Sequence, residues 1–185
     1  EAITRDKWAQ WFAQARKEIE RVPTEYTAAV KKSLLVIKAH IDNRGGILAS
    51  GDSSIFNYGR DYYCYVWPRD GAYAIWPLIR MGFAKEAIKF FEFCRDTMHK
   101  DGYLLHKYQP DRAIGSTWHP LVHNNQSELA IQEDETAIIL IMLGEFYDYI
   151  KDTEFTESLY TTLIQPAANF MAKFIDEATN LPHAS

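Results

Sequence analysis

The chain has 185 residues and a formal net charge of −5, with 47% hydrophobic and 24% charged residues. This composition is ordinary for one globular domain, or part of a larger one, that can bury a sizeable core. The absence of a basic cluster argues against a nucleic-acid surface, and no apolar run approaches the roughly 20 residues of a membrane-spanning helix. Aromatic residues are numerous (5 Trp, 11 Tyr and 10 Phe), which fits a large core, a carbohydrate-binding platform, or both.

Apolar residues at helical spacing predict six helices, four of which precede residue 100. We expect the first two at residues 4–21 and 25–42, separated by Pro23-Thr24, which ends one helix and caps the next. The second helix is apolar on nearly all sides and is therefore expected to be buried. Two more are expected at residues 70–80 and 85–98, with Gly82 as a left-handed cap between them.

The last two helices are expected at residues 134–150 and 154–176. The first of these should be buried because it is rich in Ile, and Pro166 should break or kink the second. The connections between helices three and four and between helices five and six are short. A long loop precedes each of these two pairs, and the first loop contains strand-like pieces at 46–49 and 62–66. The pattern predicts an all-α fold of helical hairpins whose long loops gather on one face, where functional residues are expected.

Residues Tyr65-Val-Trp-Pro-Arg-Asp-Gly71 combine three kinds of chemistry where a loop turns into a helix. Trp67 is an aromatic plate, Arg69 a forked cation and Asp70 a carboxylate. A flat apolar face beside a bidentate donor and acceptor suits a sugar ring, whose C–H faces stack and whose hydroxyls donate and accept. The alternative is structural: Arg69 and Asp70 form a surface ion pair that caps the helix, and Trp67 belongs to the core.

The second long loop holds Trp118-His119-Pro120 and ends in Gln132-Glu133-Asp134-Glu135. Closely packed carboxylates raise one another's pKa and include candidates for a general acid or base. Alternatively, acidic residues in a first helical turn complement the helix dipole, and adjacent ones point in different directions. Lys107, flanked by His106 and Tyr108, either reaches a sugar hydroxyl or is a solvated hairpin lysine.

Other chemistries find little support in the sequence. His119 and His123 are four residues apart, but Pro120 lies between them and no Glu follows the first His, so no zinc site is expected. No phosphate-cradling glycine loop and no G-x-S-x-G elbow occurs. Cys64 and Cys94 are either free thiols or one disulfide bridge. We therefore expect neither a metal nor a cofactor.

Four blocks, taken in order, resemble the glucoamylase-type enzymes of glycoside hydrolase family 15 in the bacterial and archaeal style. They are Lys38-Ala-His-Ile-Asp-Asn-Arg-Gly45, Tyr65-Val-Trp-Pro-Arg-Asp-Gly-Ala72, Gly115-Ser-Thr-Trp-His-Pro120 and Ile131-Gln-Glu-Asp-Glu-Thr-Ala137. Segments 90–94 and 163–171 add support, and the resemblance covers nearly everything from about residue 30 onward. Any one block is weak, whereas four in the right order are strong.

The resemblance implies that residues 1–185 form a partial catalytic domain, about half of an (α/α)6 toroid. It also implies an inverting exo-hydrolase that removes glucose from the non-reducing ends of α-glucans. Arg69 and Asp70 would hydrogen-bond the terminal glucose, and the other matching residues would line the pocket or its rim. The sequence of loop 121–130 differs from the usual sequence of the family. The expected substrate-binding residues are Trp67, Arg69, Asp70, Lys107, Trp118, His119, Gln132, Asp134 and Glu135.

In this family the general acid belongs to a Trp-Glu-Glu motif shortly after a Leu-Pro turn, and the base comes from the second half of the toroid. Leu181-Pro182 is present and Ser185 is the last residue, so neither catalytic carboxylate is expected here and the chain alone should not hydrolyse glucosides. Trehalases belong to the same family, and the blocks do not separate them from glucoamylases. A non-catalytic sugar-sensing domain is a second hypothesis, from another functional class. An oligosaccharide or α-glucan is the expected partner, and an open half-toroid would favour self-association.

The chain opens on Glu1-Ala2 without an initiator Met or a signal peptide. We expect both ends to be truncated relative to a longer protein. The compartment is left open, with the cytoplasm slightly favoured.

Overall fold

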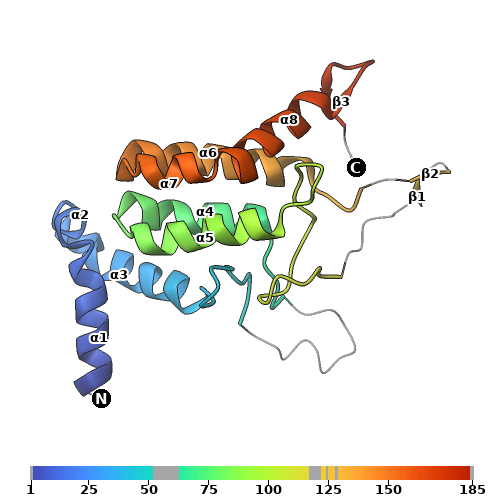
Figure 1. Ribbon diagram of the computed structural model, residues 1–185. Helices are drawn as coiled ribbons and strands as arrows, with labels where there is room; N and C mark the ends of the chain where they lie inside the picture. Colours follow the sequence, from blue (N-terminus) through green and yellow to red (C-terminus); the bar gives the residue numbers. More distant parts are fainter. Residues whose placement is uncertain (1, 52–62, 117–121, 124, 128, 184–185) are drawn as a thin grey trace, which may run out of the picture.

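The computed structural model describes residues 2–51, 63–116, 122–123, 125–127 and 129–183. Helices dominate these residues, which confirms the all-α prediction (Figure 1). The first predicted helix is in fact two, α1 (Ala2–Ala13) and α2 (Arg16–Glu20). The break lies at Ala15, which is fully buried and whose N–H bonds Phe12 O at 3.1 Å, one residue short of the α-helical partner.

Helix α3 (Thr24–Ala39) begins directly after Pro23, as expected, but the prediction that it is buried was wrong. Leu34 is its one buried side chain, and Val36 is 53% exposed. The helix lies at the edge of the bundle, where it packs mainly on α4 (Pro68–Arg80). Apolar residues on all sides of this helix therefore do not mean that other elements cover all of its sides.

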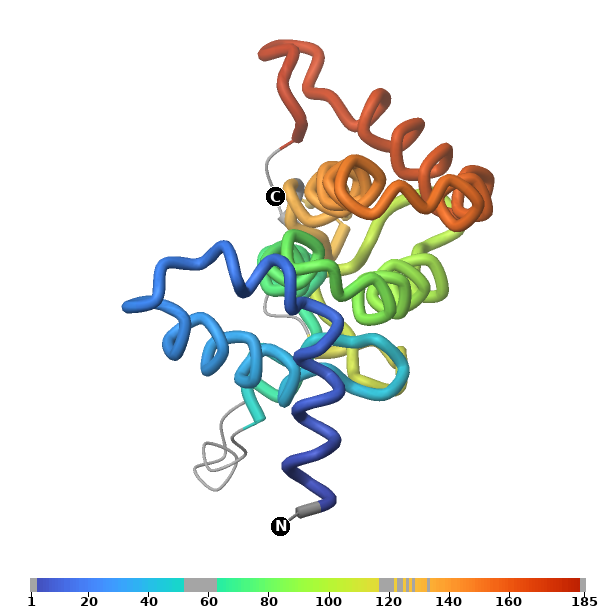
Figure 2. The backbone as a smooth tube through the Cα atoms, turned by 90° about the vertical axis from the view of Figure 1, so that its left-hand side faces the viewer, coloured from blue at the N-terminus to red at the C-terminus, as the bar shows by residue number. Residues whose placement is uncertain are grey.

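The remaining helices form two layers. Helices α4 and α6 (Glu133–Ile150) lie side by side in the first layer. Helix α5 (Ala84–Thr97) and the later helical segments form the second, as Figures 1 and 2 show from two directions. Gly82 joins α4 to α5 with a φ of +81°, which confirms the predicted left-handed cap. Helices α4, α5 and α6 keep the predicted bounds within two residues.

The last predicted helix is three segments: α7 (Thr153–Ser158), the π-helix η2 (Tyr160–Ile164) and α8 (Gln165–Lys173). Pro166 lies in the first turn of α8, where its missing N–H is tolerated. The predicted break is therefore confirmed, and the irregular turn precedes the proline.

Strands are short and lie outside the helical layers. β1 (Val122–His123) pairs antiparallel with β2 (Gln126–Ser127), and β3 (Ile175–Asp176) pairs antiparallel with β4 (Leu181–Pro182). Strand-like pieces were expected at 46–49 and 62–66, of which residue 62 lies outside the described residues. The described part of these pieces forms isolated bridges, Ile41 with Ile47 and Val66 with Tyr108, and no named strand. None of the helices in the described ranges is long and apolar enough to cross a membrane.

Phenylalanine rings fill the space between the layers. Phe91 of α5 meets Phe146 of α6 edge to face, with 5.6 Å between the ring centroids, a favourable geometry for buried aromatic pairs. Gly71, in the first turn of α4, lies against Phe90, and a Cβ at this glycine would be 2.5 Å from the Phe90 ring. The start of α4 is thus held close to α5, and this contact fixes where residues 67–70 lie.

Candidate functional site

Two helix N-termini lie at the same, loop-rich end of the first layer (Figure 1). Helix α4 starts at Pro68 after the extended residue Trp67, and α6 starts at Glu133 after Gln132. A proline at the first helical position suits this start because its fixed φ is already helical and it lacks an N–H that would have no helical partner. Two segments more than 60 residues apart in sequence are therefore brought together.

Arg69 joins the two helix starts. Its guanidinium lies 3.6 Å from Asp70 Oδ2 and 3.5 Å from Asp134 Oδ1. The three side chains are 32%, 49% and 56% exposed, respectively. Ion pairs this long and this exposed contribute little to stability. A forked donor between two accessible carboxylates is therefore available to a ligand with several hydroxyl groups.

Trp67 is only 5% exposed and is held on several sides. Its Nε1 donates a hydrogen bond to His106 Nε2 at 3.1 Å, a role for Nε2 that fits a neutral imidazole protonated on Nδ1. Tyr63 stacks on Trp67 with 5.5 Å between ring centroids, and Tyr65 meets it edge to face at 5.8 Å. Trp67 therefore belongs to a packed aromatic cluster beside the Arg69 fork.

Lys107 is 1% exposed, so the structure rules out the solvated hairpin alternative for this residue. Its Nζ lies 4.4 Å from the Tyr65 ring centroid and 5.1 Å from that of Trp67, within cation–π distance of both. Backbone hydrogen bonds place it there: Val66 and Tyr108 exchange bonds of 2.8 and 2.9 Å, and Gly115 N donates to Lys107 O at 2.9 Å.

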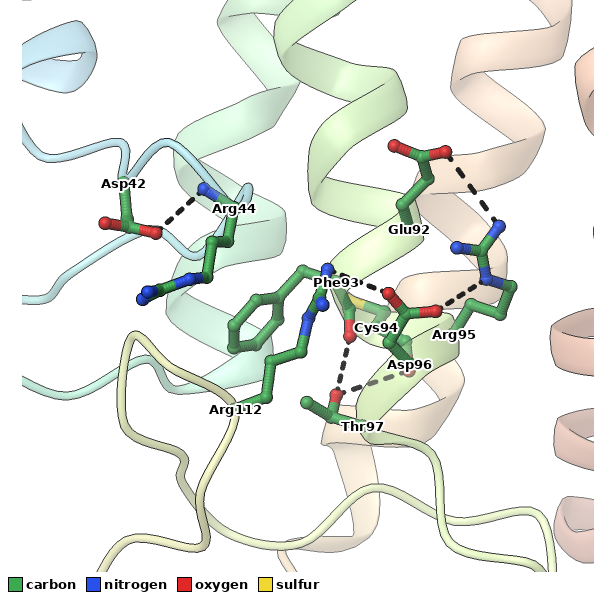
Figure 3. A network of polar contacts seen from close by, with 9 residues as sticks. All are labelled: Asp42, Arg44, Glu92, Phe93, Cys94, Arg95, Asp96, Thr97 and Arg112. Carbon is green, nitrogen blue, oxygen red and sulfur yellow. Dashed lines mark hydrogen bonds and ion pairs between the residues drawn. The ribbon is translucent and has the colours of Figure 1, made fainter.

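The loop that carries Lys107 is tied to α5 by a polar network (Figure 3). Asp96 accepts from Arg95 Nε at 2.8 Å on one oxygen and pairs with Arg112 at 2.8 Å on the other. Arg112 has a φ of +76°, a conformation that costs free energy for a side chain of this kind. The ion pair with Asp96 helps to hold the loop in this shape.

Glu135, in the first turn of α6, is fully buried. Neither of its carboxyl oxygens has a hydrogen-bond partner within the ranges that the structure describes. Burial raises the pKa of Glu135 to about 9; Arg69 opposes this rise, and Asp134 and Asp70 add to it. Glu135 is therefore a neutral carboxylic acid at neutral pH.

Gln132 stands at the N-cap position of α6, and its side chain adds another buried acceptor. Its Oε1 is inaccessible to solvent and has no hydrogen-bond partner among the described residues. The start of α6 thus holds three buried side-chain oxygens, one of Gln132 and two of Glu135, to which no donor of the described residues reaches.

The structure gathers seven of the nine expected site residues at this end of the bundle. Trp118 and His119 lie outside the described residues, so their expected roles remain predictions. His106 and Tyr65 were not singled out from the sequence, although each directly supports an expected site residue. Within the described ranges, no group of three His, Cys, Asp or Glu side chains could hold a metal ion, and both cysteines are free thiols.

Comparison with known proteins gives two distant relatives. A protein of Methanocaldococcus jannaschii named as an uncharacterized glycosyl hydrolase is 29% identical over 76% of the chain and 20% of its own length. Trehalase 2 of Sulfolobus acidocaldarius is 28% identical over 84% of the chain and 31% of its own length. No family model matches the chain. The chain thus spans a fifth to a third of the length of these relatives, one of which is named as a glycosyl hydrolase and the other as a trehalase.

Proposed function

We propose that the chain belongs to an inverting, exo-acting α-glucosidase of the glucoamylase or glucodextranase type and supplies its glucose-binding subsite. The observation that carries the proposal is the Arg69 fork between Asp70 and Asp134, open to solvent beside a packed aromatic cluster. The names of the two distant relatives support the broader class, glycoside hydrolase. The restriction to glucosidases of family 15 rests on the four sequence blocks.

A terminal glucose presents adjacent hydroxyls that both donate and accept hydrogen bonds. The Arg69 guanidinium can donate two parallel bonds, and the Asp70 carboxylate can accept two, so the pair fixes the orientation of one ring. The neutral Glu135 matters here because an ionised carboxylate at the same place would compete for Arg69. The Arg69 cluster, formed by Arg69, Asp70 and Asp134, then carries one cation and two anions, which leaves Asp134 as a further acceptor.

The proposed enzyme is longer than this chain. Hydrolysis with inversion needs an acid and a base about 6.5–9.5 Å apart on opposite sides of the scissile bond. The site residues named here are assigned to binding, and we place both catalytic carboxylates in the remainder of a toroid that this chain half completes. On this proposal, the isolated chain binds glucosides without hydrolysing them.

Trehalase is the second candidate, because one relative carries that name. A trehalase would use the same fork, since trehalose ends in a glucose with the same outer hydroxyls. Release of glucose from maltose, isomaltose and trehalose by the longer protein separates the candidates. Preference for maltose or isomaltose supports the first and preference for trehalose the second, whereas sugar binding without turnover indicates a sensing domain.

Asp70→Asn tests the subsite itself. The change removes the charge and one acceptor while it keeps the side-chain volume, so kcat/KM in the longer protein should fall at least about tenfold. Asp148→Asn, an exposed position at the far end of α6, is the matched control and should leave kcat/KM unchanged. Equal activity of the two variants would contradict the placement of the subsite.

A further inference from the structure

A pocket lies between α8 and the turn that follows α5. Its walls are Asp101, Asn169, Phe170, Lys173 and Phe174, and it measures about 190 Å³. Drug-sized ligands usually occupy roughly 300–1,000 Å³, so this pocket suits a single ring. Helix α8 ends at the same end of the bundle as the starts of α4 and α6 (Figure 1), but none of the pocket residues belongs to the Arg69 cluster.

The apolar side of the pocket belongs to a continuous series of five rings. His99 stacks on Tyr103 at 4.4 Å, and Tyr103 meets Phe170 at 5.1 Å. Phe170 stacks on Phe174 at 4.9 Å, and the series ends at His183, 5.1 Å further on. Phe170 and Phe174 are half-buried and line the pocket. The ring surface is therefore fixed by its neighbours and partly open to a ligand.

The backbone around the pocket is equally fixed. Gly102 has a φ of +90°, and a Cβ at this position would lie 2.2 Å from Pro166 O and 3.3 Å from Phe170 Cβ. The turn therefore packs directly on the start of α8, an approach that only glycine permits. His99 N donates to Tyr103 O at 2.9 Å and closes the turn. Asp101 lies in this turn, 3.3 Å from His99 Nδ1, and lines the pocket together with residues of α8.

Three polar side chains surround the rings. Asp101 is 63% exposed, and Asn169 and Lys173 are exposed on successive turns of α8. In the described part of the chain, neither Asn169 nor Lys173 makes a side-chain hydrogen bond or ion pair. Lys173 donates, Asp101 accepts, and the Asn169 amide does both.

We infer that this pocket binds one sugar ring, as a second carbohydrate site separate from the Arg69 cluster. The C–H face of a pyranose packs on Phe170 and Phe174, while its hydroxyls meet the three polar groups. A purely apolar ligand would take hydration from these groups and give them no partner, which costs free energy. That the ring is a glucosyl unit rests on the proposed function; the pocket itself indicates only a hydroxylated ring.

Titration of the isotope-labelled chain with maltose, followed by backbone amide NMR shifts, tests the inference. We expect saturable shifts at residues 101–102 and 169–174, with a millimolar dissociation constant because one ring on an open pocket makes few contacts. The Asn169→Ala/Lys173→Ala double variant should abolish these shifts and leave those near residues 67–71 intact. Alanine at exposed helix positions favours folding, so loss of structure does not explain the loss of binding.

Asp70→Asn gives the converse result and separates the two proposals. It should abolish shifts near residues 67–71 and leave those on α8. Shifts near Asp70 alone would overturn the second site and keep the proposed function. Shifts on α8 alone would overturn the proposed subsite and keep this inference. Non-saturating shifts on α8, no shifts at all, or α8 shifts that persist in the double variant would each refute the second site.

Discussion

Glu135→Gln should stabilise the chain at neutral pH and remove a pH dependence of its stability. Glu135 is fully buried, and neither of its carboxyl oxygens has a hydrogen-bond partner in the part of the chain that the structure describes. Its pKa in the folded chain is raised to about 9 from an ordinary value of 4.5. The folded chain therefore binds this proton more tightly than the unfolded chain does. The contribution of this proton to the free energy of unfolding is fully present below the unfolded-state pKa and falls as the pH rises toward the folded-state pKa.

The magnitude follows from the interval between the two pKa values. Between them, each pH unit lowers the free energy of unfolding by about 1.4 kcal/mol. At pH 7 the free energy of unfolding of the wild-type chain is therefore about 3 kcal/mol lower than it would be with Glu135 protonated in both states. This is a large part of the roughly 5–15 kcal/mol by which a folded domain is typically stable. Glutamine keeps the shape of the protonated acid and has no ionised form, so this loss disappears.

Urea unfolding at several pH values between about 5 and 8 measures the effect, read from the midpoint at constant slope. The stability of Glu135→Gln minus that of wild type should grow by about 1.4 kcal/mol per pH unit. Because other groups titrate in both chains, their contributions cancel in this difference. Glu157→Gln, at an exposed position of α7, is the control and should show a difference that does not change with pH.

A pH-independent difference for Glu135→Gln would refute the reasoning, because it would mean that Glu135 is already ionised in the folded chain. Buried carboxyl groups that find a hydrogen-bonded donor behave in this way. A variant that is less stable than wild type at every pH would also contradict the prediction. In that case the carboxyl group would be making a stabilising contact that an amide cannot replace.

Three further changes have definite expected outcomes. Gly71→Ala should lower the free energy of unfolding by about 1–3 kcal/mol, because the new Cβ would lie 2.5 Å from an aromatic ring of α5. Trp11→Phe should cost about 1–3 kcal/mol, since it removes the 2.7 Å donor to the buried Glu86 carboxylate. Asp96→Ala should speed amide hydrogen exchange about fivefold in loop 109–116 by releasing its ion pair.

Each of these three predictions can be contradicted by a specific result. Unchanged urea midpoints for the first two variants would show that the glycine contact and the indole hydrogen bond are not tight in solution. A loop whose amide exchange is the same with and without Asp96 would show that backbone pairing alone holds it. Lys17→Ala, at an exposed position on α2, is a common control and should change none of these measurements.

Helical periodicity predicted most of the fold because local rules decide where these helices begin and end. Proline and glycine marked the boundaries of α3 and α4, and the structure agrees within a few residues. The burial of α3 could not be predicted in the same way. Whether an apolar face is covered depends on which other elements reach it, and a helix at the edge of a bundle retains apolar residues that remain exposed.

In the candidate site, too, the sequence predicted individual residues, whereas their proximity depends on the packing of distant segments. The sequence indicated Arg69 and Asp134 separately, and only the packing of α4 on α6 brings them within 3.5 Å. Sequence reasoning also left open whether Lys107 is solvated, because a lysine between His and Tyr gives no sign of its burial. The aromatic rings around it come from a segment about 40 residues earlier, and their proximity depends on the Val66–Tyr108 pairing.

The π-helix η2 fixes the rotational phase of α8. An α-helix turns about 100° per residue, and a π turn adds one residue to that count. If Tyr160–Ile164 formed regular α-helix with every residue kept, everything beyond it would be rotated by about that angle. Phe170 would then point away from Tyr103, with which it now packs at 5.1 Å. One inserted residue thus determines which side of α8 the turn after α5 meets.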